Sequence, residues 1–399
     1  MKYLILVGDG MGDRPVAALD GRTPLAAAET PHMDRLAQTG RLGLSHTIPA
    51  DKSPGSDTAN MSLMGYDPAR YHTGRSPIEA AAMGVDLTPG QIAFRCNLVT
   101  LDRTGASPIM TDYAAGHITS AEAAELIAAV DAALGRPGLK FHHGVSYRHL
   151  LVWDNGPLAA ATVPPHDYSG QDVGQFLPTD GELGQVCDLV RASWSVLAEH
   201  PVNQARRAAG KNPADSIWLW GQGTRPSLPT IPERYGLSGF TVSAVDLVKG
   251  LGILAGLKAV DVAGATGWLD TNYAGKVAAV LENLTAGDDL AFLHVEAPDE
   301  AGHSGKLELK LQAIAEFDRN VVGPVLEGLA KLGEHRVLLV TDHFTPLEVM
   351  THTREAVPFV IWDSRAPQAG GAAYSEAAAA ATGWVVDKAH DLIGLLLER

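Results

Sequence analysis

Cysteine is scarce in this chain of 399 residues, in which Cys96 and Cys187 are the only two. No CxxC pair is present, so neither a disulfide framework nor a thiolate metal site is indicated. A protein that needs no disulfides is typical of a reducing compartment.

Long apolar runs are also missing. No apolar stretch approaches the ~18 residues that a membrane-spanning helix needs. The apolar run after Met1 and Lys2 is too short for a secretory signal, and no small-residue cleavage site follows it. We therefore expect no membrane segment and a cytoplasmic location.

Positive charge is in deficit, with 31 Lys and Arg against 46 Asp and Glu, which gives a net charge of −15. Such a balance argues against a nucleic-acid or anionic-membrane surface, because phosphate backbones are bound by basic surfaces. It still permits a local cationic pocket for a small anion. The chain is long enough for two or three domains, and the sequence does not indicate an oligomeric state.

Acidic residues follow three short apolar runs that predict buried strands at 2–7, 290–295 and 336–340. Asp9 comes after the first run, Asp299 after the second and Asp342 after the third. In open α/β sheets, ligands bind at the carboxyl ends of the strands. The three carboxylates are therefore candidates for one site.

Histidines accompany these acidic residues. His303 is four residues beyond Asp299, His343 follows Asp342 directly, and His352 precedes another predicted strand at 357–362. Carboxylate oxygens and imidazole nitrogens are ligands for divalent cations. Each pair alone could also be a surface turn with a capping Asp and an unrelated His. Together, the six side chains suit two metals better than one.

Ser56 lies in a second candidate segment. Pro54 and Gly55 predict a turn, and residues 59–64 are compatible with a helix. A Ser at a helix N-terminus meets free N–H groups and a dipole that favour an anion, so it could attack phosphorus. The alternative is that Ser56 only caps the helix.

The pattern of elements predicts an α/β fold with an insertion. Strands and helices alternate in residues 1–80 and again in 215–399, which favours a mostly parallel sheet flanked by helices. Residues 81–214 instead contain alternating strands typical of an antiparallel sheet, and two helices. We expect a smaller inserted α+β domain there. Residues 366–383 are weakly patterned and are expected to form a loop.

The loop after the first strand, Gly8-Asp-Gly-Met-Gly-Asp13, is not a dinucleotide fingerprint, because G-x-G-x-x-G would need Gly at position 13.

Cations of the insertion and its borders are candidates for binding an anionic substrate, since Arg offers bidentate and permanently charged donors. Alternatively, these cationic side chains are ordinary surface charges that are exposed to solvent. These candidates are Arg75, Arg148, Arg206, Arg207 and Lys211. His142, His143 and His166 are candidate acid or base groups, or ordinary core and surface histidines.

Taken together, the motifs resemble those of the alkaline phosphatase superfamily. The resemblance rests on Asp9 in GDGMGD, Ser56 in PGSDTANMSLMGYDP, DEAGH at 299–303, TDH at 341–343, and His352. The chain is most similar to cofactor-independent phosphoglycerate mutases of the archaeal type and their bacterial relatives. The resemblance extends over nearly the whole chain, with the motifs in the same order.

This resemblance implies an α/β phosphatase-like domain interrupted by a lid domain, and two divalent metal ions such as Mn, Mg or Zn. It assigns Asp299, His303 and His352 to one metal. It assigns Asp9, Ser56, Asp342 and His343 to the other, with Ser56 as the nucleophile that becomes phosphoserine. The implied reaction interconverts 3-phosphoglycerate and 2-phosphoglycerate, so the partner is a small phosphorylated metabolite.

One departure from the family pattern lies after His352, where the family often has Thr-x-Asp-Pro-Val-Pro. Here the segment is Thr353-Arg-Glu-Ala-Val-Pro358. The departure concerns substrate identity more than metal chemistry. The alternative function is a related metal-dependent phosphotransferase or phosphatase that acts on another small metabolite, such as an enzyme of the homoserine kinase-like branch.

Overall fold

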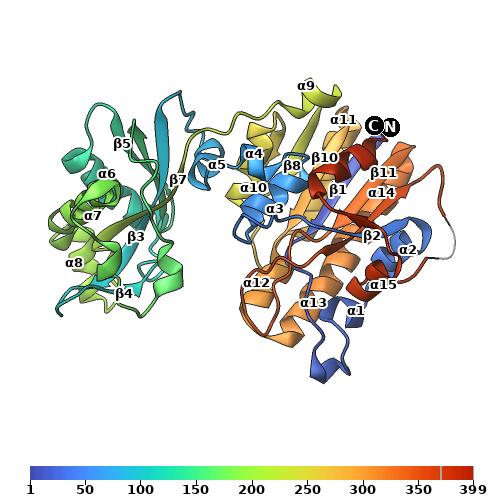
Figure 1. The fold of residues 1–399 in the computed structure, drawn as a ribbon, viewed down its shortest axis with the longest axis horizontal. Coiled ribbons are helices and arrows are strands. Elements are labelled where there is room, and N and C mark those ends of the chain that lie inside the picture. The colour runs from blue at the N-terminus through green and yellow to red at the C-terminus, as the bar shows by residue number, and fades with distance from the viewer. Residues whose placement is uncertain (369–370, 399) are drawn as a thin grey trace. The chain divides into compact units, whose positions relative to one another are not determined.

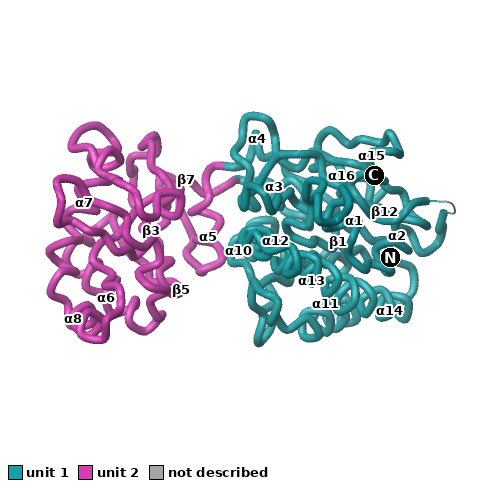
Figure 2. Tube along the Cα trace, turned by 90° about the horizontal axis from the view of Figure 1, so that it is seen from below, with its two compact units in different colours: residues 1–72, 227–399 teal, residues 73–226 magenta. Residues whose placement is uncertain are grey.

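The chain forms two compact units in its computed structural model, which describes residues 1–368 and 371–398. Unit 1 contains Met1–His72 and Ser227–Arg399, and unit 2 is the insertion Thr73–Pro226 (Figure 2). The insertion is thus bounded at 73 and 226 rather than at 81 and 214. The reason is that helix α5 (Ser76–Ala82) packs against two strands of unit 2, β3 and β7.

Unit 1 is built on an eight-stranded sheet with the order β13-β2-β12-β11-β1-β10-β8-β9 (Figure 1). Its strands are β1 (Lys2–Gly8), β2 (Arg41–Ser45), β8 (Gly239–Val242), β9 (Lys258–Val260), β10 (Leu290–Val295), β11 (His335–Val340), β12 (Val357–Asp363) and β13 (Val385–Val386). Within the described residues, β12 alone runs against the others. The predicted α/β fold with a mostly parallel sheet is confirmed.

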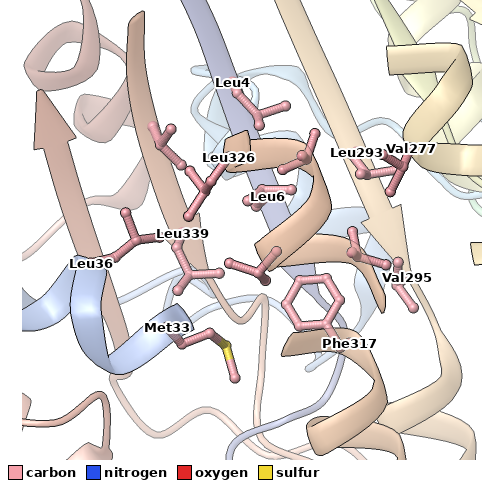
Figure 3. Packing of buried hydrophobic residues seen from close by; sticks show 14 of the residues in the cluster. Leu4, Leu6, Met33, Leu36, Val277, Leu293, Val295, Phe317, Leu326 and Leu339 are labelled. Carbon is pink, nitrogen blue, oxygen red and sulfur yellow. The ribbon is translucent and has the colours of Figure 1, made fainter. Parts of the chain in front are cut away.

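The central strand β1 is buried on both faces, as its unbroken apolar run predicts for a parallel sheet. Leu4 and Leu6 point into the larger core of unit 1, which they share with Leu293, Phe317 and Leu339 (Figure 3). The alternating residues of β1 point to the opposite face and are also buried.

Helices cover both faces of this sheet. The longer helices that contribute to the core of Figure 3 are α2 (Pro31–Thr39), α11 (Tyr273–Ala286), α13 (Leu307–Phe317) and α14 (Gly323–Leu332). On the opposite face, α10 (Asp246–Leu254) packs against β8 and α16 (Leu392–Leu397) against β11. The shorter helices of unit 1 are α1 (Pro24–Ala27), α3 (Ser56–Leu63), α4 (Pro68–Tyr71), α9 (Ile231–Tyr235), α12 (Ala297–His303) and α15 (Glu376–Ala381).

Unit 2 has an antiparallel sheet, in which the long strand β3 pairs with β4, β6 and β7, and β6 pairs with β5. The strands are β3 (Gln91–Asp102), β4 (Ile109–Asp112), β5 (Leu139–Val145), β6 (Arg148–Asp154) and β7 (Ser216–Gly223). Helices α6 (Ser120–Leu134), α7 (Gly181–Ala198) and α8 (Pro201–Ala208) complete the unit. It has its own apolar core between the sheet and these helices.

The two ends of unit 2 lie side by side. The hydroxyl of Thr73 donates to the carbonyl of Thr224, and the main chains at Gly74 and Gly223 approach closely. A Cβ atom on Gly74 would come within 2.1 Å of the carbonyl oxygen of Gln222, so this approach requires glycine. The insertion therefore begins and ends at one narrow neck.

The prediction of a loop at 366–383 is only partly correct. Residues 369 and 370 lie outside the described part of the chain, and Glu376–Ala381 form the helix α15. Ser375 caps this helix, and the carboxylate of Glu376 accepts hydrogen bonds from Thr23 and from the amide of Asp13. The sequence pattern did not predict this helix, because its run of alanines has no amphipathic periodicity.

Among the described residues, no helix combines the length and apolar character needed to cross a membrane.

Candidate active site

Three carboxylates meet at the carboxyl edge of the unit 1 sheet. Asp9 follows β1, Asp342 follows β11, and Asp299 lies on α12, which begins just after β10. Because β1 pairs in parallel with both β10 and β11, the three strands end level with one another. The carboxylates are buried, at 1% exposure for Asp9, 4% for Asp299 and 0% for Asp342.

His343 lies between these carboxylates and is itself fully buried. Its Nε2 atom lies 3.3 Å from Oδ1 of Asp9 and 3.4 Å from Oδ2 of Asp342. Its Nδ1 atom lies 4.0 Å from Oδ1 of Asp299. The sequence-based assignment gave His343 to only one metal, whereas here its ring contacts both groups of ligands.

His303 and His352 complete the cluster on the other side of Asp299. The Nε2 atom of His303 lies 3.1 Å from Oδ2 of Asp299, and that of His352 lies 3.4 Å from Oδ1. The two Nε2 atoms are 3.0 Å apart. Both rings are half-buried, so this side of the cluster is partly open to solvent.

Hydrogen bonds fix the tautomers of two rings. Nδ1 of His303 lies 2.9 Å from the carbonyl oxygen of Met350, which can only accept, so this nitrogen carries the proton. Nδ1 of His343 lies 3.3 Å from Oγ1 of Thr345, whose hydroxyl donates to Asp299. In the neutral ring of His343, Nε2 is therefore left with a lone pair that faces carboxylate oxygens. Burial lowers the pKa of His303, but its interactions with Asp299 outweigh burial and raise the pKa to about 9, so without a cation this ring is protonated at pH 7.

This electrostatic arrangement fits divalent cations. Burial, followed by the charges of Asp342 and Asp299, raises the pKa of Asp9 well above its usual range. Burial also lowers the pKa of His343 to about 4, so its ring is neutral at pH 7. Oδ1 of Asp9 is buried and accepts no hydrogen bond. Imidazole lone pairs and buried carboxylate oxygens that converge at one place are the ligand set that Mn²⁺, Mg²⁺ or Zn²⁺ would bind.

Two groups of side chains could each hold a cation. In each group one ligand atom per residue lies within 4.8 Å of the others. The groups are Asp9, Asp342 and His343, and Asp299, His343 and His352.

Ser56 is the first residue of α3, and its hydroxyl does not cap the helix. The N-cap position is Gly55, which offers no side chain. Instead, Oγ of Ser56 lies 3.2 Å from Nε2 of His343. One turn later, the amide of Asn60 donates to the carbonyl of Ser56 and to Oδ2 of Asp342, at 3.0 and 2.9 Å. The capping alternative is therefore not supported, and α3 is coupled directly to the carboxylate cluster.

The sequence analysis missed Asn60, Thr345 and His294. Nε2 of His294 lies 3.0 Å from Oδ2 of Asp9, within the buried strand β10. Asn60 could have been found from its i, i+4 relation to Ser56, because such positions share a helix face. No sequence signal distinguishes His294 or Thr345 from ordinary strand and loop residues.

Unit 2 contains a separate cluster of three arginines around one carboxylate. Arg95 is buried and pairs with Glu79, and Nε of Arg75 lies 2.9 Å from the same carboxylate. Arg148 is exposed at the start of β6, and its charge also acts on Glu79 and Arg95. The structure thus gathers the predicted Arg75 and Arg148 with two residues that were not predicted. Three guanidinium groups therefore act on one buried carboxylate.

The other predicted cations of unit 2 differ from these. Arg206 is 3% exposed, and its guanidinium bonds the carbonyls of Ala115 and Asn212 and the carboxylate of Glu122. Arg206 therefore has a structural role and is not available to a substrate. Arg207 and Lys211 are exposed near the end of α8.

The fold and this site define an α/β protein with a serine beside a carboxylate–imidazole cluster at the edge of a mostly parallel sheet. A family model described as 2,3-bisphosphoglycerate-independent phosphoglycerate mutase matches residues 37–203. A probable mutase of that description from Geobacter sulfurreducens is 50% identical, and one from Methanothrix thermoacetophila is 49% identical, each over 100% of both chains. The chain belongs to the family of 2,3-bisphosphoglycerate-independent phosphoglycerate mutases.

Solved structures agree with this family membership. The PH0037 protein of Pyrococcus horikoshii has a TM-score of 0.83 and 30% identity, over 100% of this chain and 96% of that one. A cofactor-independent phosphoglycerate mutase from Thermoplasma acidophilum has a TM-score of 0.65 and 28% identity, over 100% and 99%. The family expected from the motifs is confirmed.

The arginine cluster generates a stability prediction for Glu79→Gln. This change leaves the buried Arg95 without a charged partner, and we expect it to lower the free energy of unfolding by about 3–5 kcal/mol at pH 7. Burial raises the pKa of Glu79, but Arg95 and Arg75 outweigh it, so the pKa is lowered overall. The stabilisation is therefore present above the unfolded carboxyl pKa and is lost as the pH falls below it.

Urea denaturation at pH 7 and at acid pH measures this effect. The matched control is Glu125→Gln, an exposed glutamate on α6, for which we expect a change within about 0.5 kcal/mol. Equal stability of the two variants at pH 7 would contradict the buried ion pair.

Proposed function

We propose that this protein interconverts 3-phosphoglycerate and 2-phosphoglycerate through a phosphoserine on Ser56, as a step of glycolysis and gluconeogenesis. The observation that carries the proposal is the Ser56 hydroxyl, 3.2 Å from His343 within a cluster of buried carboxylates. Membership of the mutase family supports the choice of phosphoglycerate as substrate.

Two divalent cations, Mn²⁺, Mg²⁺ or Zn²⁺, are proposed cofactors of this centre. Asp299, His303 and His352 would hold one ion. The other ion would be held by Asp9, Ser56, Asp342 and His343. When bound, such ions lower the pKa of a serine hydroxyl and neutralise the oxygens of a phosphoryl group. The ring of His343 contacts both ligand groups, so it would link the two halves of the centre.

Ser56 accepts the phosphoryl group in the first half of the proposed reaction. Its Oγ loses a proton and forms the new P–O bond, while the bond to the glycerate oxygen breaks and that oxygen gains a proton. In the second half, the other hydroxyl of glycerate attacks phosphoserine, and Ser56 regains its proton. Asn60 holds the Ser56 end of α3 against Asp342 throughout. Water must be excluded between the halves, because otherwise phosphoserine is hydrolysed.

Unit 2 is proposed to act as the lid and to bind the charged groups of the substrate. Phosphoglycerate carries a carboxylate and a phosphate, and guanidinium groups bind both in a bidentate manner. Arg75 and Arg148 are the main candidates, because the cluster around Glu79 brings their positive charges together. Arg207 and Lys211 remain secondary candidates as exposed cations.

An assay for conversion of 3- to 2-phosphoglycerate, coupled to enolase and without 2,3-bisphosphoglycerate, tests the function. We expect activity for the wild type and none above background for Ser56→Ala, because the phosphoryl acceptor is lost. Ser53→Ala, an exposed serine three residues upstream, should remain active. Release of inorganic phosphate alone would favour a phosphatase, and turnover only with homoserine and ATP would favour the kinase-like alternative. Wild-type turnover by Ser56→Ala would exclude the phosphoserine.

Removal of metal tests the proposed cofactors. Because seven side chains from one sheet edge would hold the ions, elemental analysis should find two divalent ions per chain. Dialysis against a chelator should abolish mutase activity, and Mn²⁺ should restore it. Full activity in chelator, with no metal in the protein, would refute the centre.

Arg148→Ala tests the substrate contacts. The loss of one charge-assisted pair should raise KM for 3-phosphoglycerate by roughly 10-fold or more, since such pairs contribute about 1.5–3 kcal/mol. The metal content should not change, because all proposed ligands belong to unit 1. Steady-state kinetics beside elemental analysis give both quantities. Arg136→Ala, an arginine near the end of α6 that belongs to neither cluster, is the control. Normal kinetics for Arg148→Ala would remove this residue from the substrate site.

A further inference from the structure

Lys310 is a buried cation that the proposed chemistry does not use. It lies on α13, and its side chain has no exposed surface. Its Nζ atom lies 2.8 Å from Oδ2 of Asp13, a carboxylate that is also buried. A buried ammonium group is costly unless it is paired and fully hydrogen-bonded, so its remaining donors are informative.

Those donors reach two different loops. One bond is made to the carbonyl of Gly12, at 3.1 Å, in the loop after β1. The other is made to the carbonyl of Thr345, at 2.7 Å, in the loop after β11. An ammonium group has three N–H donors. All three are therefore used between two loops that come from opposite ends of the chain.

These two loops carry most of the proposed ligands. Asp9 lies three residues before Gly12, and Asp342 and His343 lie just before Thr345. The loops also bond to each other, because the amide of Thr345 donates to the carbonyl of Gly12 and the amide of Gly10 donates to Asp342. Lys310 thus holds the place where the two ligand-bearing loops meet.

Thr345 transmits this constraint to the ligands themselves. Its main-chain carbonyl is bound by Lys310, while its side-chain hydroxyl donates to Asp299 and lies 3.3 Å from Nδ1 of His343. A displacement of the Thr345 main chain would therefore move the group that orients a carboxylate and an imidazole. Partners that orient metal ligands in this way strongly influence metal affinity.

We propose that Lys310 is a positioning residue, which sets the spacing between the ligands of the loop after β1 and those of the loop after β11. The proposal rests on the proposed metal centre. It differs from simple stabilisation, because it requires metal affinity and loop order to change in a protein that is still folded.

Lys310→Met replaces the ammonium group with an apolar side chain of similar length. At a temperature where circular dichroism shows the variant folded, we expect the Kd for Mn²⁺, measured by calorimetric titration, to rise by about 10–100-fold. We also expect kcat to fall more than KM for 3-phosphoglycerate changes, since the substrate contacts remain.

Arg336→Met is the matched control, because Arg336 is another buried cation with several partners. It lies at the opposite end of β11, where it bonds Asp363 at 2.7 Å and the carbonyl of Leu396 at 2.8 Å. Its loss should lower stability and leave the Kd for Mn²⁺ unchanged. This comparison separates positioning from the general cost of removing a buried charge.

Hydrogen exchange in metal-free protein gives a readout that does not depend on the proposed function. Lys310→Met should accelerate exchange of the amides of Gly10 and Met11, which bond to Asp342 and Thr341. If the wild type binds no Mn²⁺, the proposed centre fails and exchange alone decides the role of Lys310. If Lys310→Met does not fold, Asp13→Asn, which removes only the paired charge, takes its place. Unchanged exchange and unchanged Kd in a folded variant would overturn the proposal.

Discussion

Mutual repulsion among three buried carboxylates is the constraint on which unit 1 depends. Asp9, Asp299 and Asp342 lie at one sheet edge with almost no exposure to water. Separation would relieve the repulsion, but parallel pairing of β1 with β10 and β11 prevents it, since the strands end level with one another. The surrounding core supplies the stability that holds these strands together. The fold thus keeps three carboxyl groups close together, where a divalent cation can offset their repulsion.

Much of this arrangement could be predicted from the sequence, because each carboxylate lies within four residues of the end of a recognisable apolar run. Strand order could not be predicted in this way, since a run of Leu, Ile and Val does not specify its neighbours. The central position of His343 was missed for a related reason. Its two ring nitrogens face different carboxylates, and ring orientation depends on hydrogen bonds that no motif encodes.

Buried polar residues on helices were the least predictable. Lys310 lies on α13 and Glu79 on α5, and charged residues on the helices of a globular protein are usually exposed. Only tertiary structure shows that these two point inward and organise several partners. Arg206 shows the converse error, because a cationic segment suggested an anion site and the guanidinium is instead enclosed by main-chain carbonyls. Sequence patterns identify well which residues can carry charge or bind a ligand. They do not reveal which of these residues already bind partners within the folded protein.

The neck at Thr73 and Thr224 has a consequence for how such an enzyme can change over evolution. A segment whose two ends meet can be exchanged with little disturbance to the host domain. Every proposed metal ligand lies in unit 1, whereas the arginine cluster lies wholly in unit 2. In the proposed function, phosphoryl chemistry and choice of metabolite would thereby be inherited as separable modules. Replacement of unit 2 could direct the same catalytic centre to another anion, without any change to the sheet of unit 1 that positions the centre.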